Sequence, residues 1–145
     1  MYNTVKTLHS YWAYLVLLIL IFATINAIIK FIGKKEYHAK DFRLSLFTLI
    51  VSHIQLLIGL ILYFVSPRFE LWGELGSKVM SNSIARLYLV EHPLINIIAV
   101  TLITIGYSKH KKKLTSTAKF KTITIFYLIA LVLFLSRIPW NTWFS

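Results

Sequence analysis

Four long apolar runs constrain this chain more than any other feature of its sequence. Their approximate limits are residues 11–32, 44–65, 84–107 and 122–138 of 145. Each run is close to the roughly 20 residues that cross about 30 Å of hydrocarbon as a helix. Hydrophobic residues make up 57% of the chain, more than the roughly 45–50% typical of soluble domains. The sequence therefore predicts an all-α fold in which residues 1–145 form one integral membrane domain, a four-helix transmembrane bundle with up-down-up-down order.

The positive charges gather beside two of the three connections between these runs. Eleven of the 16 Lys and Arg residues flank the first and third connections, and five lie toward the opposite ends of the helices. Short cytoplasmic loops carry an excess of Lys and Arg. We therefore expect a bacterial inner-membrane protein with both termini outside, in the periplasm. The basic residues lack the interleaved aromatics of a nucleic-acid surface, so the expected charged partner is the lipid bilayer and not nucleic acid.

Capping and breaking signals mark the predicted helix ends. Residues 1–10 are interpreted as a short outer segment, and the first apolar run is too long for a cleavable signal, so the first helix is expected to remain in the mature protein. Asp41 is the expected N-cap of the second helix. Pro93 should kink the third helix and free a carbonyl near Leu89, four residues earlier.

The longest connection joins the second and third runs. Phe69, Trp72 and Leu75 fall there at near-helical spacing, among charged residues. This pattern predicts a short interfacial helix within residues 69–80 that lies on the outer surface of the membrane.

The chain contains no cysteine. This excludes disulfides, thiolate metal sites, iron–sulfur clusters and covalently attached c-type haem. The sequence also shows no nucleophile–base arrangement, phosphate loop or pair of catalytic carboxylates, so it leaves open whether the protein is an enzyme.

Three histidines, His9, His53 and His92, lie inside or at the edge of the predicted membrane helices. Ionisable side chains are costly in hydrocarbon and usually mark a functional site. With a helix rise of about 1.5 Å per residue, His53 lies roughly 20 Å and His92 roughly 13 Å below the outer helix ends. His9 lies near the outer interface and could approach His92 if the first helix starts deep. His38 and His110 fall in Lys-rich connections and are expected to be solvated.

Two imidazoles on different helices could hold one b-type haem. Such a haem needs neutral imidazoles on opposite sides of its iron, an apolar slot and cations for its propionates. The preferred axial pair is His53 and His92, with His9 and His92 as the close alternative. Arg86 and Arg137, near the outer ends of the third and fourth helices, are the expected propionate partners.

Glu91 lies too deep to remain charged without a partner. It is expected to pair with Arg86 or Arg137, or else to be protonated. The histidines also have a structural interpretation, in which Ser, Asn, Gln or a freed carbonyl satisfies their ring nitrogens.

Six short motifs spread over nearly the whole chain carry a family resemblance. They are Leu8–Trp12, Asp41–Leu44, His53–Gly59, Tyr63–Pro67, Val90–Pro93 and Ile138–Trp140. Together they resemble a family of small bacterial four-helix membrane proteins usually labelled cytochrome b. The architecture is more loosely similar to b-type cytochromes and to copper-resistance D-like membrane domains. The resemblance implies that His9, His53 and His92 are the polar signature, and three histidines imply one haem at most.

Three hypotheses follow from the sequence. In the leading one, the protein binds one haem b in the outer half of the bundle and transfers electrons, with a quinone or a redox protein as partner. In the second, His9, His53 and His92 with Glu91 bind zinc, copper or iron. In the third, the protein is an accessory subunit of a larger membrane complex, and its histidines are satisfied internally. A homo-oligomer is compatible with each of the three.

Overall fold

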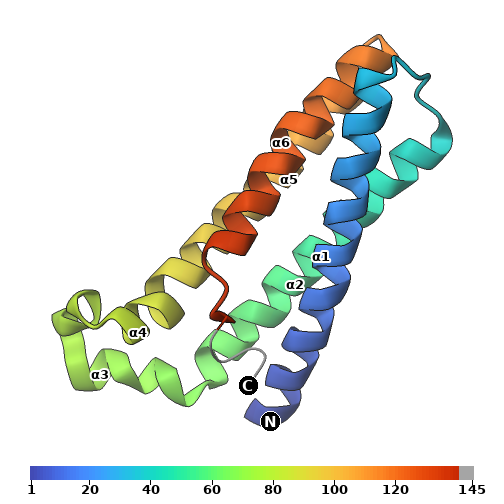
Figure 1. Ribbon diagram of the computed structural model, residues 1–145. Coiled ribbons are helices and arrows are strands. Elements are labelled where there is room, and N and C mark those ends of the chain that lie inside the picture. The colour runs from blue at the N-terminus through green and yellow to red at the C-terminus, as the bar shows by residue number, and fades with distance from the viewer. Residues whose placement is uncertain (141–145) are drawn as a thin grey trace.

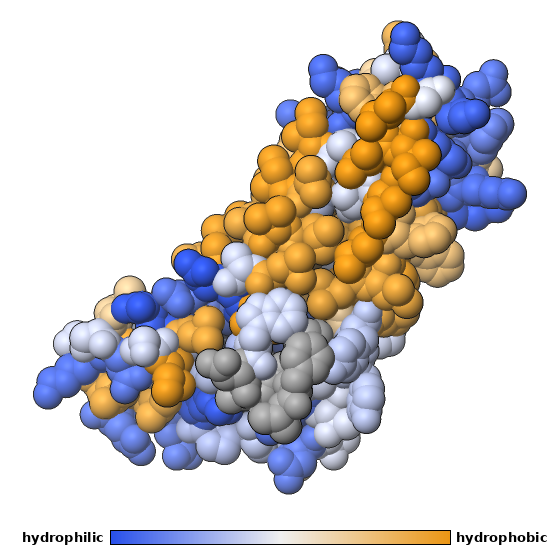
Figure 2. All heavy atoms as spheres, in the orientation of Figure 1, coloured by the Kyte–Doolittle hydropathy of each residue, from blue (hydrophilic) through white to orange (hydrophobic). Residues whose placement is uncertain are grey.

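The computed structural model describes residues 1–140, and no strand occurs within them. Four long helices lie side by side in alternating directions (Figure 1). They are α1 (Tyr2–Ile32), α2 (Ala39–Val65), α5 (His92–Lys111) and α6 (Ser116–Ser136). With the short turns that precede α5, the third span runs from Ser83 to Lys111, and all four spans are long and apolar enough to cross a membrane. Figure 2 shows an apolar band between two more polar ends. The prediction of an all-helical chain with four apolar helices is confirmed.

Helix α1 begins at Tyr2, nine residues before the predicted start at residue 11, so residues 2–10 are helical and not a separate element. Neither proline nor glycine interrupts the chain between Tyr2 and Ile32. The polar residues of the first turns are compatible with a helix, and the Thr7 hydroxyl donates to the Asn3 carbonyl at 2.9 Å. As a result, His9 is held on a continuous helix.

The helices pack as a four-membered ring. The main partners of α1 are α2 and α6, and α5 likewise packs against α6 and α2, so α1 and α5 face each other across the diagonal. Small residues such as Ala23, Ala99 and Ala130 lie in the buried core and allow close approach of the helices. The helices α5 and α6 also approach closely at Gly106 of α5, where an added Cβ would lie 2.9 Å from Phe126 Cγ.

The basic end of the bundle contains the connections over residues 33–38 and 112–115, which Figure 1 places together at the top. Asp41 organises the first of them from the third position of α2 and not from the N-cap, which is His38. Its carboxylate accepts hydrogen bonds from Lys30 Nζ at 2.7 Å, Asn26 Nδ2 at 2.9 Å and His38 N at 2.9 Å. The N-cap lies three residues earlier than predicted because His38 and Asp41 form a reciprocal capping box.

His110 closes the same end, and the prediction that it is solvated is wrong. Its side chain is fully buried between the two connections. Tyr37 Oη lies 2.7 Å from His110 Nε2, and the Tyr37 backbone N–H donates to Ser116 Oγ at 2.8 Å. Burial raises the pKa of Tyr37 well above its ordinary value, so the hydroxyl remains protonated and donates to the imidazole. His38, by contrast, is exposed as expected.

At the opposite end, the long connection forms a series of short helical turns instead of one interfacial helix. They are η1 (Pro67–Glu70), α3 (Leu71–Leu75), η2 (Gly76–Ser81) and α4 (Ser83–Arg86). Gly76 has a φ of +53°, a backbone conformation that ends α3 and that side chains rarely adopt. We call this series of turns the arm. Val79 of the arm is fully buried and packs against Ala85 and Leu89, which holds the arm against the third span.

A single π-helical turn, η3 (Leu87–Glu91), joins α4 to α5 directly before the His92–Pro93 pair. Pro93 has no N–H to donate to the Leu89 carbonyl. That carbonyl accepts a hydrogen bond from Tyr63 Oη at 2.9 Å, and Tyr63 Oη in turn accepts one from Trp72 Nε1 at 2.8 Å. The predicted break at Pro93 is thus bridged by a side chain from α2, and α3 is linked to the same point.

Replacing Tyr63 with phenylalanine should destabilise this end of the bundle. The change removes the donor to the Leu89 carbonyl and the acceptor for the Trp72 indole. A buried polar group without its partner costs about 1–3 kcal/mol. Denaturant unfolding in detergent, followed by circular dichroism, would measure the loss. The control is Tyr11→Phe, since Tyr11 is 69% exposed; equal stability of the two variants would contradict the expected role of Tyr63.

Candidate functional site

A cavity of about 350 Å³ lies inside the end of the bundle that is opposite the basic connections. We call this the cavity end. The α1 residues that line the cavity run from Tyr2 to Leu17, which is about 22 Å of helix at 1.5 Å per residue. Its wall is mostly apolar, with Val16, Val100 and Phe134 at depth. Apolar walls with a few convergent polar groups are typical of small-molecule sites.

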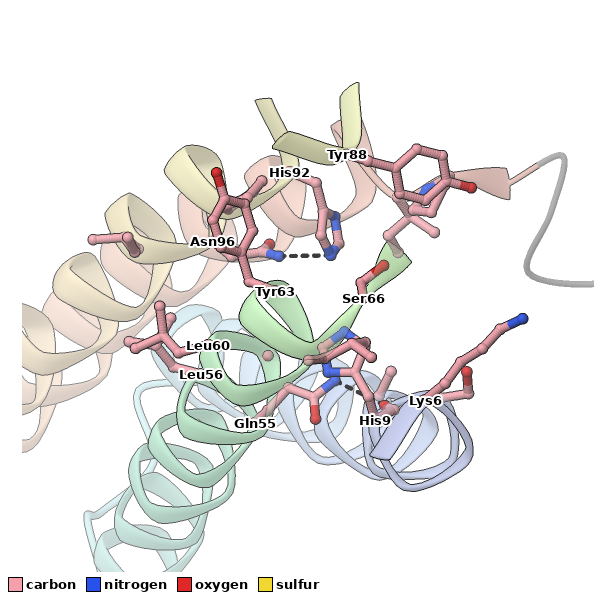
Figure 3. Close-up of a pocket in the computed structure, with 18 of the residues that line it drawn as sticks. Lys6, His9, Gln55, Leu56, Leu60, Tyr63, Ser66, Tyr88, His92 and Asn96 are labelled. Carbon is pink, nitrogen blue, oxygen red and sulfur yellow. Dashed lines mark hydrogen bonds between the residues drawn. The ribbon is translucent and has the colours of Figure 1, made fainter. Parts of the chain in front are cut away.

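His9 and His92 face each other across this cavity. His9 projects from α1 and His92 from the first residue of α5, so the two rings come from diagonally opposed helices. Their ring centroids are 6.2 Å apart and the ring planes are at 85°. Figure 3 shows the two side chains pointing toward one another.

The His9 ring lies in a pocket that α2 leaves open for it. Gly59 faces the ring, and a Cβ at this position would lie 3.2 Å from His9 Cε1. Gln55, one turn earlier on α2, donates from Nε2 to the His9 carbonyl at 2.9 Å. The buried atoms His9 Nδ1 and Gln55 Oε1 have no hydrogen-bond partner in the part of the chain that the structure describes. Buried polar atoms are rarely left in this state, so water or a ligand in the cavity could complete their hydrogen bonds.

The protonation pattern of the His92 ring follows from its neighbours. His92 Nδ1 lies 2.9 Å from the Arg137 carbonyl oxygen, which can only accept, so Nδ1 carries the hydrogen. In the neutral ring Nε2 then carries the lone pair, and it accepts a hydrogen bond from Asn96 Nδ2 at 3.1 Å. Histidines that bind metals also donate one ring N–H to a carbonyl and ligate through the other nitrogen. In His92 that other nitrogen is engaged by Asn96, whose amide would have to move aside for a metal to bind.

The structure does not bring His53 to this site. Its side chain is exposed, Nδ1 donates to the Leu49 carbonyl at 2.8 Å, and Nε2 lies 3.3 Å from Thr104 Oγ1. His53 is two residues before Gln55, which is about 200° around the helix, so it points away from the face that lines the cavity. Of the two histidine pairs predicted from the sequence, only the alternative pair of His9 and His92 is brought together.

Arg86 and Arg137 are engaged by Glu91 and do not line the cavity. Arg86 Nε lies 3.0 Å from Glu91 Oε2, and Arg137 Nε lies 3.8 Å from Glu91 Oε1. The expected pairing of Glu91 is confirmed, with both arginines instead of one. The cationic residues in the cavity wall are Lys6 and Arg68. Lys6 and Arg68, and not Arg86 and Arg137, therefore lie where the propionates of a haem in this cavity would need cations.

Sequence reasoning missed several residues that shape the site. Gln55, Gly59, Tyr63, Lys6 and Arg68 all line the cavity. A signal was present on α2, because Ser52, Gln55, Gly59 and Ser66 follow one face at spacings of three, seven and fourteen residues. Gln55 and Gly59 on this face are the residues that contact His9 of α1.

The geometry can be compared with what a metal centre requires. Two imidazoles on opposite sides of one ion, with each nitrogen about 2.0–2.1 Å from it, have ring centroids about 6 to 6.5 Å apart. The observed 6.2 Å fits this range. Among residues 1–140 no group of three or more His, Asp or Glu side chains could hold a metal ion, so His53 and Glu91 do not complete a larger cluster with this pair.

No known protein family, curated protein or solved structure matches this chain. The resemblance to cytochrome b-labelled membrane proteins therefore remains a prediction.

Proposed function

We propose that this protein binds one haem b between His9 and His92 and transfers electrons within a membrane. The observation that carries the proposal is the pair of imidazoles, which face each other at 6.2 Å across an internal cavity. Gly59 supports it, because an added Cβ there would lie 3.2 Å from His9 Cε1, so glycine leaves room for the imidazole in the cavity wall.

The residues of the site have separate roles in this proposal. His9 and His92 would be the axial ligands. The Arg137 carbonyl would hold the hydrogen on His92 Nδ1, so the Nε2 lone pair would bind the iron in place of Asn96 Nδ2. The apolar wall would contain the macrocycle. Lys6 and Arg68, on different elements of the cavity wall, would bind the propionates. The haem would supply one-electron redox chemistry, which no side chain of the site provides.

The charge distribution supports an orientation in the membrane. The basic end, with eleven Lys and Arg residues, would lie in the cytoplasm, and the cavity end with both termini would face the periplasm of a bacterial inner membrane. A ligand at the cavity end would then lie in the outer half of the bilayer, within reach of a quinone in the lipid or of a redox protein outside. Self-association or assembly with a larger membrane complex is compatible with this orientation.

The optical spectrum of the purified protein tests the proposal. Expression with adequate haem supply should give Soret and α bands on reduction and about one haem per chain. A stoichiometric transition metal without haem absorbance would replace the proposal with a metal site at the same two histidines. Imidazole is a suitable ligand for zinc, copper or iron. Absence of both, with one constant partner after purification from native membranes, would favour the accessory-subunit hypothesis.

A further inference from the structure

The end of α6 is held twice by neighbouring residues at the start of α5. His92 Nδ1 donates to the Arg137 backbone carbonyl at 2.9 Å, and the Glu91 carboxylate lies 3.8 Å from the Arg137 side chain. Glu91 and His92 are adjacent in sequence, so one segment contacts both the backbone and the side chain of Arg137. The Arg137 carbonyl follows the last helical residue of α6, Ser136, where carbonyls lack intrahelical donors.

Glu91 is itself fixed from the other side. Arg86 Nε donates to Glu91 Oε2 at 3.0 Å, and Arg86 Nη1 donates to the Met80 carbonyl at 2.9 Å. The carboxylate therefore connects the short turns of the arm to the end of α6. The side chains of Glu91 and Arg137 are 30% and 46% exposed, so the ion pair contributes little free energy. A pair of this strength shifts the equilibrium between two positions of Arg137 by a few-fold at most.

We infer that Glu91 is a positioning residue: by holding Arg137, it keeps the Arg137 carbonyl against His92 and so fixes which nitrogen of His92 is presented to the cavity. This inference deepens the proposed function, in which His92 is an axial ligand. It also holds for the protein without haem, because the contact between His92 and Arg137 needs no bound ligand.

The direct test is nitrogen NMR of the haem-free protein labelled with ¹⁵N-histidine in detergent, with His92→Ala used to assign the signal. The wild type should show one dominant His92 tautomer with the hydrogen on Nδ1. Glu91→Gln should give a mixture of tautomers, because Arg137 is released. Arg137→Gln should do the same, since it retains the backbone carbonyl but loses the side chain held by Glu91.

The controls separate positioning from a general loss of charge. Glu74→Gln removes an exposed carboxylate from the same end and should leave the His92 signal unchanged. Glu91→Asp keeps the charge and should preserve more of the single tautomer than Glu91→Gln. An unchanged His92 tautomer in folded Glu91→Gln or in Arg137→Gln overturns the inference.

This result is independent of the haem proposal. A wild-type protein that binds no haem but loses its single His92 tautomer in Glu91→Gln would retain the positioning role and refute the proposed function. A haem-binding protein whose Glu91→Gln variant keeps both the single tautomer and the reduction potential would support the proposed function and refute the positioning role.

Discussion

Replacing either His9 or His92 with alanine is expected to abolish the six-coordinate haem spectrum, whereas replacing His53 is expected to leave it intact. Each of the first two changes removes one of the two facing imidazoles in the cavity. His53 is exposed on the other side of α2 and bonds to Leu49. Reduced-minus-oxidised difference spectra of the three variants, normalised to protein concentration, would show the contrast.

Adding free imidazole to the histidine variants tests whether the missing side chain acts as a ligand. A His9→Ala or His92→Ala protein that still folds should recover six-coordinate bands with free imidazole, because the cavity can hold the small ring in place of the lost side chain. His53→Ala serves as the matched control for removing a histidine from one of the four apolar spans. Loss of the spectrum in His53→Ala, together with its retention in His9→Ala, would overturn the proposed axial pair.

Replacing Gly106 with alanine should destabilise the bundle. A Cβ at this position would lie 2.9 Å from Phe126 Cγ on α6, closer than ordinary van der Waals contact. Overpacking of a filled core costs about 1–3 kcal/mol. Thermal or denaturant unfolding in detergent, followed by circular dichroism, should detect the decrease.

Gly73→Ala provides the matched control for this change. Gly73 lies in α3, and an added Cβ would meet no atom within 4 Å. Alanine also has a higher helix propensity than glycine, so this variant should be no less stable than the wild type. A Gly106→Ala protein as stable as Gly73→Ala would mean that α5 and α6 are less closely packed than described.

The helices were predictable because apolar runs of about 20 residues have few alternatives. Their ends were less predictable. Outside the hydrocarbon, polar residues are compatible with helix or coil, so the sequence did not show that α1 continues to Tyr2 or that α6 begins at Ser116. The Pro93 break was predictable from chemistry alone, whereas its bridging by Tyr63 requires the relative placement of two helices.

The site was only partly predictable for the same reason. The sequence identified His9 and His92 as candidates, but their meeting depends on α1 being helical through residue 9 and on the diagonal placement of α1 and α5. The depth of the residues along their helices favoured His53 as the partner of His92. Depth does not report the direction in which a side chain points around its helix, so this prediction was incomplete. His110 shows the converse case, in which a histidine beside lysines is buried by Tyr37 from a distant connection.

The two ends of the bundle differ in a way that bears on how a ligand would arrive. Tyr37 and His110 seal one end, while the cavity reaches Tyr2 and Lys6 at the other. A ligand would therefore enter at only one of the two ends of the bundle. A molecule that occupies the cavity would enter beside the first turns of α1, far from the end that Tyr37 and His110 close.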